Sequence, residues 1–157
     1  MKTAVVFYSL DGNCASVAEE IKTQMNADLI RLQTKDEKKR SKIGKFFWGG
    51  GMVFLNKKPP LKPYSFDASG YDLIIIGAPV WASSPAPPVK TFLSETVIKN
   101  KKIAVFVCHA GGKGGSLDKF KALLEGNEIA GAADFKEPAR SGGELKNQIA
   151  DWAKSLS

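Results

Sequence analysis

The sequence has few of the residues that build cross-linked or metal-centred proteins: its 157 residues include two cysteines and one histidine. Cys14 and Cys108 stand far apart, without a C-x-x-C or Cys/His ligand spacing, so the sequence predicts neither a disulfide framework nor a zinc site. His109 alone cannot build a metal cluster. We therefore expect no bound metal.

Long apolar runs are also missing. No stretch approaches the roughly 20 apolar residues of a membrane-spanning helix, and the initial M-K-T-A-V-V leads into a strand pattern without a cleavable signal. Apolar residues make up 43% and charged residues 25% of the sequence, as in ordinary globular proteins. We expect one cytoplasmic domain, residues 1–157, with no membrane insertion.

Acidic residues are scarce in one segment. Residues 35–62 hold nine Lys or Arg against Asp36 and Glu37, a net charge of +7 that equals the formal net charge of the whole chain. The charge therefore belongs to this segment and not to the remainder of the fold. Nucleic acid is not expected as a partner, because no recognised binding module accompanies the basic residues.

Strand-like and helix-like patterns alternate along the chain. Residues 71–77 and 102–108 are apolar at nearly every position, as is typical of central strands buried on both faces. Residues 27–34 and 129–135 are more polar and suit the two edges. With the apolar run at residues 4–8, these patterns predict a single-domain α/β protein whose doubly wound five-stranded parallel sheet has the order 2-1-3-4-5.

Four helices are predicted from apolar residues that recur at helical spacing. The first begins after Gly12, and the second holds Pro87–Pro88 in its first turn. Ser116 is expected to cap the third, and Ser141 has capping-box spacing to Glu144 before the fourth. Their apolar faces comprise Val17, Ala18, Ile21 and Met25; Val89, Phe92 and Leu93; Leu117, Phe120 and Leu124; and Leu145, Ile149, Trp152 and Leu156.

An excursion at residues 35–64 interrupts the alternation between the second and third strands. Its three consecutive glycines and three prolines argue against one continuous helix. A structureless segment of about 30 residues is unusual inside a compact domain, so we expect part of it to pack on the fold. It is either a solvated basic surface or a docking surface for a redox partner with an acidic face, centred on Phe46, Phe47 and Trp48.

Three loops follow strands at one end of the predicted sheet. S-L-D-G-N-C at residues 9–14 precedes a helix, whose first N–H groups favour an anion such as phosphate. A-P-V-W-A-S-S-P at residues 78–85 places Trp81 on a proline-stiffened turn, and the glycines of residues 109–115 let backbone approach a flat ligand. Ligands bind at this end of parallel sheets, so the loops predict a mononucleotide site.

Outside the excursion, nearly the whole chain resembles the flavodoxin family. The resemblance lies in Y-S-x-x-G-N at residues 8–13, Y-D-x-I-I-x-G-x-P-V-W at residues 71–81 and P-A-P-P-V-K-T-F-L at residues 85–93. It implies a flavodoxin-like fold, bound FMN and electron transfer. It places at the phosphate Ser9, Asp11, Gly12, Asn13 and Cys14, and around the flavin ring Pro79, Val80, Trp81, Ala82, Ser83, Ser84, Cys108, His109, Ala110, Gly111, Gly112 and Gly115.

The sequence departs from the common family pattern at two loop positions. Asp11 stands where a Thr or Ser usually donates to the phosphate, and Cys14 stands where another Thr does so. Asp11 is either a helix cap or a charge that opposes the phosphate. Cys14 is either a reactive thiol at a helix N-terminus or a small buried hydrophobe.

Three other side chains have two interpretations each. Trp81 forms a wall of the flavin site or packs on the end of the sheet. His109 donates a proton to a flavin nitrogen or bonds to backbone at the strand end. Lys113 offsets negative charge on a reduced flavin or is solvated.

The resemblance implies an electron carrier with no catalytic residue of its own, because the flavin performs the chemistry. Two alternatives belong to other classes. One is an FMN-dependent NAD(P)H oxidoreductase that stacks the nicotinamide on the flavin and reduces quinones or similar acceptors. The other is a binding module that kept the fold without the flavin.

Overall fold

The structure, a computed structural model, describes residues 1–36, 51 and 56–157. Five parallel strands form the sheet in the order β2-β1-β3-β5-β6, which confirms the predicted order, and β4 pairs antiparallel with β3. The strands are β1 (Thr3–Tyr8), β2 (Asp28–Leu32), β3 (Leu73–Trp81), β4 (Ser84–Pro85), β5 (Lys102–His109) and β6 (Glu128–Lys136).

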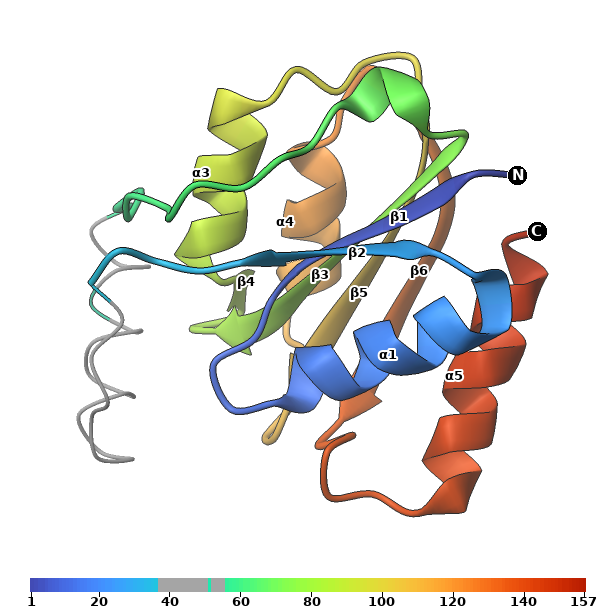
Figure 1. The fold of residues 1–157 in the computed structure, drawn as a ribbon. Coiled ribbons are helices and arrows are strands. Elements are labelled where there is room, and N and C mark those ends of the chain that lie inside the picture. The colour runs from blue at the N-terminus through green and yellow to red at the C-terminus, as the bar shows by residue number, and fades with distance from the viewer. Residues whose placement is uncertain (37–50, 52–55) are drawn as a thin grey trace.

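Helices cover both faces of this sheet (Figure 1). Helices α1 and α5 lie on one face, and α3 and α4 lie on the other. The helices are α1 (Asn13–Met25), α3 (Pro87–Glu95), α4 (Ser116–Ala122) and α5 (Gly143–Ser155), with a short 3₁₀ turn, η1, at Ala68–Gly70. No described helix is long and apolar enough to cross a membrane.

The two central strands explain the two-sided core. Alternate residues of β3 point to opposite faces, so Ile74 and Ile76 pack beneath α3 and α4 while Leu73 and Ile75 pack beneath α1 and α5. All four side chains are fully buried. The apolar runs at residues 71–77 and 102–108 are therefore central strands, as predicted.

Several predicted boundaries and caps are wrong. Strand β3 begins at Leu73 and continues past Gly77 to Trp81, because Ala78 and Pro79 still pair with β5 and the last two residues pair with β4. Strand β6 extends one residue beyond each predicted end. The residues before α4 and α5 are Gly115 and Gly142, and neither helix has a side-chain cap. Ser116 lies inside α4 instead, and the Ser141 hydroxyl donates to backbone carbonyls of residues 136 and 137.

The described ends of the excursion are attached to the fold. Thr34 and Leu61 form an antiparallel bridge beyond the end of β2. The hydroxyl of Thr91, on α3, donates to the Pro59 carbonyl at 2.9 Å, and Tyr64 contacts the ring of Phe92 at a centroid distance of 5.7 Å. Packing is thus confirmed for residues 59–64. Phe46, Phe47 and Trp48 lie outside the described residues.

Candidate cofactor site

The loop between β1 and α1 is held in a fixed shape by its own hydrogen bonds. The Ser9 hydroxyl is buried and accepts from the Ala15 N–H at 3.1 Å, and the Gly12 carbonyl accepts from the Ser16 N–H at 2.9 Å. Gly12 has φ 87°, a left-handed conformation that favours glycine. A Cβ on Gly12 would meet no atom within 4 Å, so the loop borders open space at the N-terminus of α1.

The next two residues of the loop face the protein. The Asn13 side-chain oxygen accepts from the Ala139 N–H at 3.0 Å, which ties this loop to the segment between β6 and α5. Cys14 is buried beside Cys108, and burial, with the Cys108 thiol adding to it, raises the pKa of the Cys14 thiol well above its usual value. The interpretation of Cys14 as a reactive thiolate is therefore wrong, and the buried hydrophobe is confirmed.

The second loop is a tight hairpin rather than an open turn. Trp81 pairs with Ser84, and the two residues between them, Ala82 and Ser83, have φ 47° and 53°. Positive φ at both central positions is the type I′ geometry that joins twisted strands best. It is costly for residues other than Gly or Asn, and such strain is frequent at functional sites.

The hairpin contacts both other loops. The ring of Trp81 meets the ring of Tyr8, the last residue of β1, edge-on at a centroid distance of 5.7 Å. Gly114 packs so closely on Ser83 that a Cβ there would lie 2.5 Å from the Ser83 hydroxyl oxygen. The Lys119 ammonium, on α4, donates to the Ser83 carbonyl at 2.9 Å. The three loops therefore converge at the carboxyl ends of β1, β3 and β5.

The third loop is open on its outer side. Residues 110–115 are exposed. A Cβ on Gly111, Gly112 or Gly115 would meet no atom within 4 Å. Together with the open side of Gly12, this leaves backbone uncovered on the outer side of the first and third loops, where a ligand can approach it closely.

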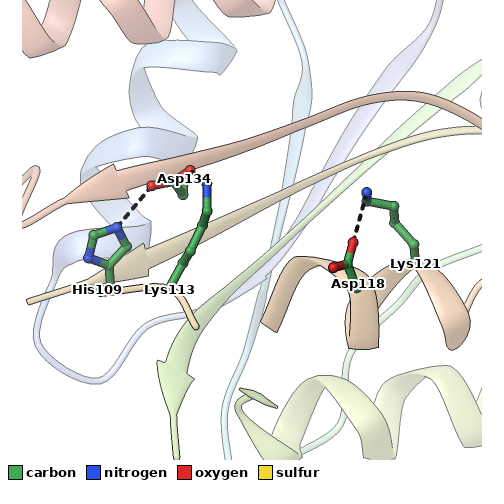
Figure 2. A network of polar contacts seen from close by, with 5 residues as sticks. All are labelled: His109, Lys113, Asp118, Lys121 and Asp134. Atoms are coloured by element: carbon green, nitrogen blue, oxygen red, sulfur yellow. Dashed lines mark hydrogen bonds and ion pairs between the residues drawn. The ribbon is translucent and has the colours of Figure 1, made fainter. Parts of the chain in front are cut away.

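A charged network closes one side of this loop (Figure 2). His109 Nε2 lies 3.0 Å from Asp134 Oδ2, and Lys113 Nζ lies 2.6 Å from Asp134 Oδ1. Because an ionised carboxylate only accepts, His109 donates from Nε2. Within the described structure the buried Nδ1 of His109 has no hydrogen-bond partner. The His109 ring therefore bonds to a side chain on the neighbouring strand β6, while the His109 carbonyl accepts from the Glu137 N–H at 2.9 Å, and Lys113 is paired.

Sequence reasoning missed two charged residues at this end of the sheet. Asp134 lies in a predicted edge strand, near the carboxyl end of that strand. The predicted strand order places this strand next to the one that ends at His109, so the sequence could have indicated that the two residues are close. Arg31, on β2, donates from its guanidinium Nη2 to the Ser9 carbonyl at 3.1 Å. No local pattern indicates that contact, because it depends on the pairing of β2 with β1.

The predicted site residues thus divide into three groups. Backbone or small side chains border open space at Gly12, Gly111, Gly112 and Gly115. Other residues lie exposed or half-buried along the loops and hairpin: Asp11, Asn13, Pro79, Val80, Trp81, Ala82, Ser83, His109 and Ala110. The remaining ones are buried and support the loops from beneath: Ser9, Cys14, Ser84 and Cys108.

A separate cleft of about 830 Å³ lies at the other end of the sheet. It runs along residues 61–69 and 95–101, which lead into the amino ends of β3 and β5, and it is also lined by Lys35, which follows β2. Parallel α/β sheets bind mononucleotides at the carboxyl ends. The three loops, and not this cleft, are therefore the candidate cofactor site.

The Asp134 network predicts acid-dependent stability. The hydrogen bond from Lys113, with a smaller effect of His109, holds the pKa of Asp134 below its usual value, and partial burial opposes this shift. A carboxylate whose pKa is lower in the folded state stabilises the fold at pH values above its unfolded-state pKa, which is about 3.9. This stabilisation is lost as the pH falls through the pKa of the folded state. We expect Asp134→Asn to lower the free energy of unfolding by about 1 kcal/mol at pH 6, and the difference from wild type to vanish towards pH 2.

Urea unfolding at pH 6, 4 and 2 measures this difference. Asp118→Asn is the matched control, because Asp118 forms an exposed pair with Lys121 at 3.2 Å on α4 (Figure 2). Exposed pairs contribute little, so this variant should follow wild type at every pH. A deficit in Asp134→Asn that persists unchanged at pH 2 would show that lost packing, and not charge, causes it.

Solved structures of flavodoxin-like flavoproteins have the same fold as this chain. No protein-family profile and no curated protein matches the chain. A flavoprotein from Lactobacillus acidophilus, solved in complex with FMN, is 24% identical with a TM-score of 0.76, covering 97% of this chain and 98% of its own. Two-electron reduced flavodoxin from Megasphaera elsdenii is 21% identical with a TM-score of 0.61, covering 98% and 99%. A flavodoxin, WrbA-like protein from Agrobacterium tumefaciens is 18% identical with a TM-score of 0.63, covering 99% and 94%.

Proposed function

We propose that this chain, whose fold is that of the flavodoxin-like flavoproteins, binds FMN and carries electrons in the cytoplasm. The observation that carries the proposal is the convergence of three loops around open space at the carboxyl ends of β1, β3 and β5. The flavodoxin-like neighbours, one of them solved with FMN, support the same cofactor. FMN supplies reversible electron transfer when bound.

The residues of the chain fit the two ends of FMN. At the phosphate end, the N-terminus of α1 presents backbone N–H groups at Gly12–Cys14, and the Ser9 hydroxyl, which accepts from Ala15, still has a hydrogen to donate. At the ring end, Trp81 and the glycine backbone of residues 111–115 supply the walls. These residues bind and orient, while the stiff hairpin keeps Trp81 in place.

The charged network at the ring end controls how much positive charge faces the cofactor. Lys113 pairs with the carboxylate of Asp134, which also bonds to the His109 ring, so the positive charge of Lys113 is largely balanced. A balanced network gives a reduced, negatively charged ring little stabilisation. This favours a carrier that releases its electrons readily.

Steady-state turnover separates the carrier from the enzyme alternative. The FMN-loaded protein is mixed with NADH or NADPH and a quinone, and oxidation of the nicotinamide is followed by absorbance. A carrier shows no turnover until a reductase is added. Sustained oxidation by the chain alone would make it an FMN-dependent oxidoreductase, and failure to bind any flavin would leave the binding module.

The partner that we propose has an acidic face and docks on the basic excursion. Lys35, Lys57, Lys58 and Lys62 are exposed on its described ends, next to the bridge that follows β2. The carboxyl end of β2 lies beside that of β1, so the base of the excursion adjoins the phosphate loop (Figure 1). A patch of one sign raises encounter rates with a partner of opposite sign.

Salt dependence tests this docking surface. The measured quantity is the rate of electron transfer between the FMN-loaded protein and an acidic redox partner. Replacing Lys38, Lys39, Arg40 and Lys42 together by Gln should lower this rate at low salt and make it depend less on ionic strength. The control replaces the exposed Lys22, Lys99, Lys121 and Lys154 by Gln, which removes the same charge elsewhere. Equal salt slopes in the two variants would contradict a specific docking role, and tight binding of DNA by wild type would replace it.

A further inference from the structure

We propose that Arg31 supplies the positive charge that holds the phosphate of the cofactor, a role that rests on the proposed function. Between Ser9 and Cys14 the loop contains no basic residue, and the first turn of α1 adds no basic side chain. Asp11 even places a carboxylate there. Arg31 comes from the neighbouring strand β2, outside the loop sequence.

Strand register places the Arg31 side chain on the correct side of the sheet. Arg31 is the direct partner of Phe7 in the pairing of β2 with β1, and directly opposed residues point to the same face. Phe7 is buried in the apolar cluster under α1, together with Val17 and Ile21. Arg31 therefore lies on the face that carries α1, the helix whose N-terminus forms the phosphate seat.

A hydrogen bond fixes the guanidinium at the loop. Arg31 Nη2 donates to the Ser9 carbonyl at 3.1 Å while the side chain stays exposed at the edge of the sheet. A guanidinium is planar, permanently charged and able to give two parallel N–H bonds to phosphate oxygens. Fixed beside Ser9, it adds attraction for a phosphate dianion at this loop.

The test compares two flavins that differ only in the phosphate. Apoprotein is titrated with FMN and with riboflavin for wild type, Arg31→Gln and Arg31→Lys, and urea unfolding verifies that each variant is folded. For Arg31→Gln we expect the affinity for FMN to fall about tenfold. The attraction between two unit charges several ångströms apart in a partly solvated site corresponds to about a tenfold change in the dissociation constant. Riboflavin affinity should not change, and Arg31→Lys should lie between Arg31→Gln and wild type.

Asp11→Thr is the matched change of opposite sign. Removing the carboxylate should tighten FMN binding, again without effect on riboflavin. When Asp11→Thr is combined with Arg31→Gln, the FMN affinity should depend less on salt concentration than it does in Arg31→Gln alone. Weaker FMN binding by Asp11→Thr would show that Asp11 positions the loop.

The outcomes separate this role from the proposed function. Suppose that wild type binds FMN. If Arg31→Gln then binds FMN as tightly as wild type, or loses affinity for FMN and riboflavin equally, Arg31 only ties the loop to β2. In that case this role is overturned and the proposed function stands. If wild type binds neither flavin, the proposed function and this role are both overturned.

Discussion

Gly77→Ala is expected to lower the free energy of unfolding by about 3 kcal/mol, the upper end of the usual cost of overpacking a core. Gly77 lies in the middle of β3 and is the direct partner of Phe106 on β5. The ring of Phe106 lies over the Gly77 backbone, so a Cβ at this position would overlap ring atoms. The glycine is therefore a packing requirement and not a turn residue.

The ring cannot move away easily. Phe106 is fully buried and contacts Phe135 and Trp152 at centroid distances of 6.4 and 6.3 Å. Urea unfolding measures the loss, and Phe106→Leu combined with Gly77→Ala should recover part of it. Gly143→Ala is the control, because a Cβ on Gly143 would meet no atom within 4 Å. A stable Gly77→Ala single variant would show that the Phe106 ring has another position available.

Trp81→Ala is expected to weaken FMN binding by about tenfold to a hundredfold and to shift the visible flavin spectrum. Contact between an aromatic side chain and a planar heterocycle contributes about 1–3 kcal/mol. Trp81 is half-buried at the tip of β3, fixed by its edge contact with Tyr8 and by pairing with Ser84. It is therefore presented as a rigid wall.

Trp152→Phe is the control for this measurement, since Trp152, on α5, packs against Phe106 and Phe135 in the core on the face that α1 and α5 cover. It should keep the wild-type affinity and spectrum. If Trp81→Ala also keeps both, Trp81 merely packs on the end of the sheet.

The sheet was predictable because its signals are local. Apolar residues at nearly every position of β3 and β5, against the more polar residues 27–34 and 129–135, place the strands at the centre and at the edges. The order then follows from right-handed crossovers. The three loops were also predictable, because parallel strands bring their carboxyl ends together.

The missed features depend on contacts between distant residues. Ala82 and Ser83 have no local preference for left-handed backbone, and across the hairpin the Ala86 N–H donates to the Pro79 carbonyl at 3.0 Å. Asp134 and Arg31 acquire their positions from strand pairing. Glycines, and not the expected serines, precede α4 and α5. A side-chain cap contributes only about 1 kcal/mol, so it does not by itself decide where a helix begins.

Flavin binding by the purified chain tests the central claim most directly. Apoprotein is mixed with excess FMN, FAD and riboflavin together, freed of unbound flavin, and denatured by heat, and the released cofactor is identified by mass and measured by absorbance. We expect one FMN per chain, because the open space beside Gly12 and the N-terminus of α1 suit a terminal phosphate. Release of FAD in its place, or of no flavin at all, would contradict the account.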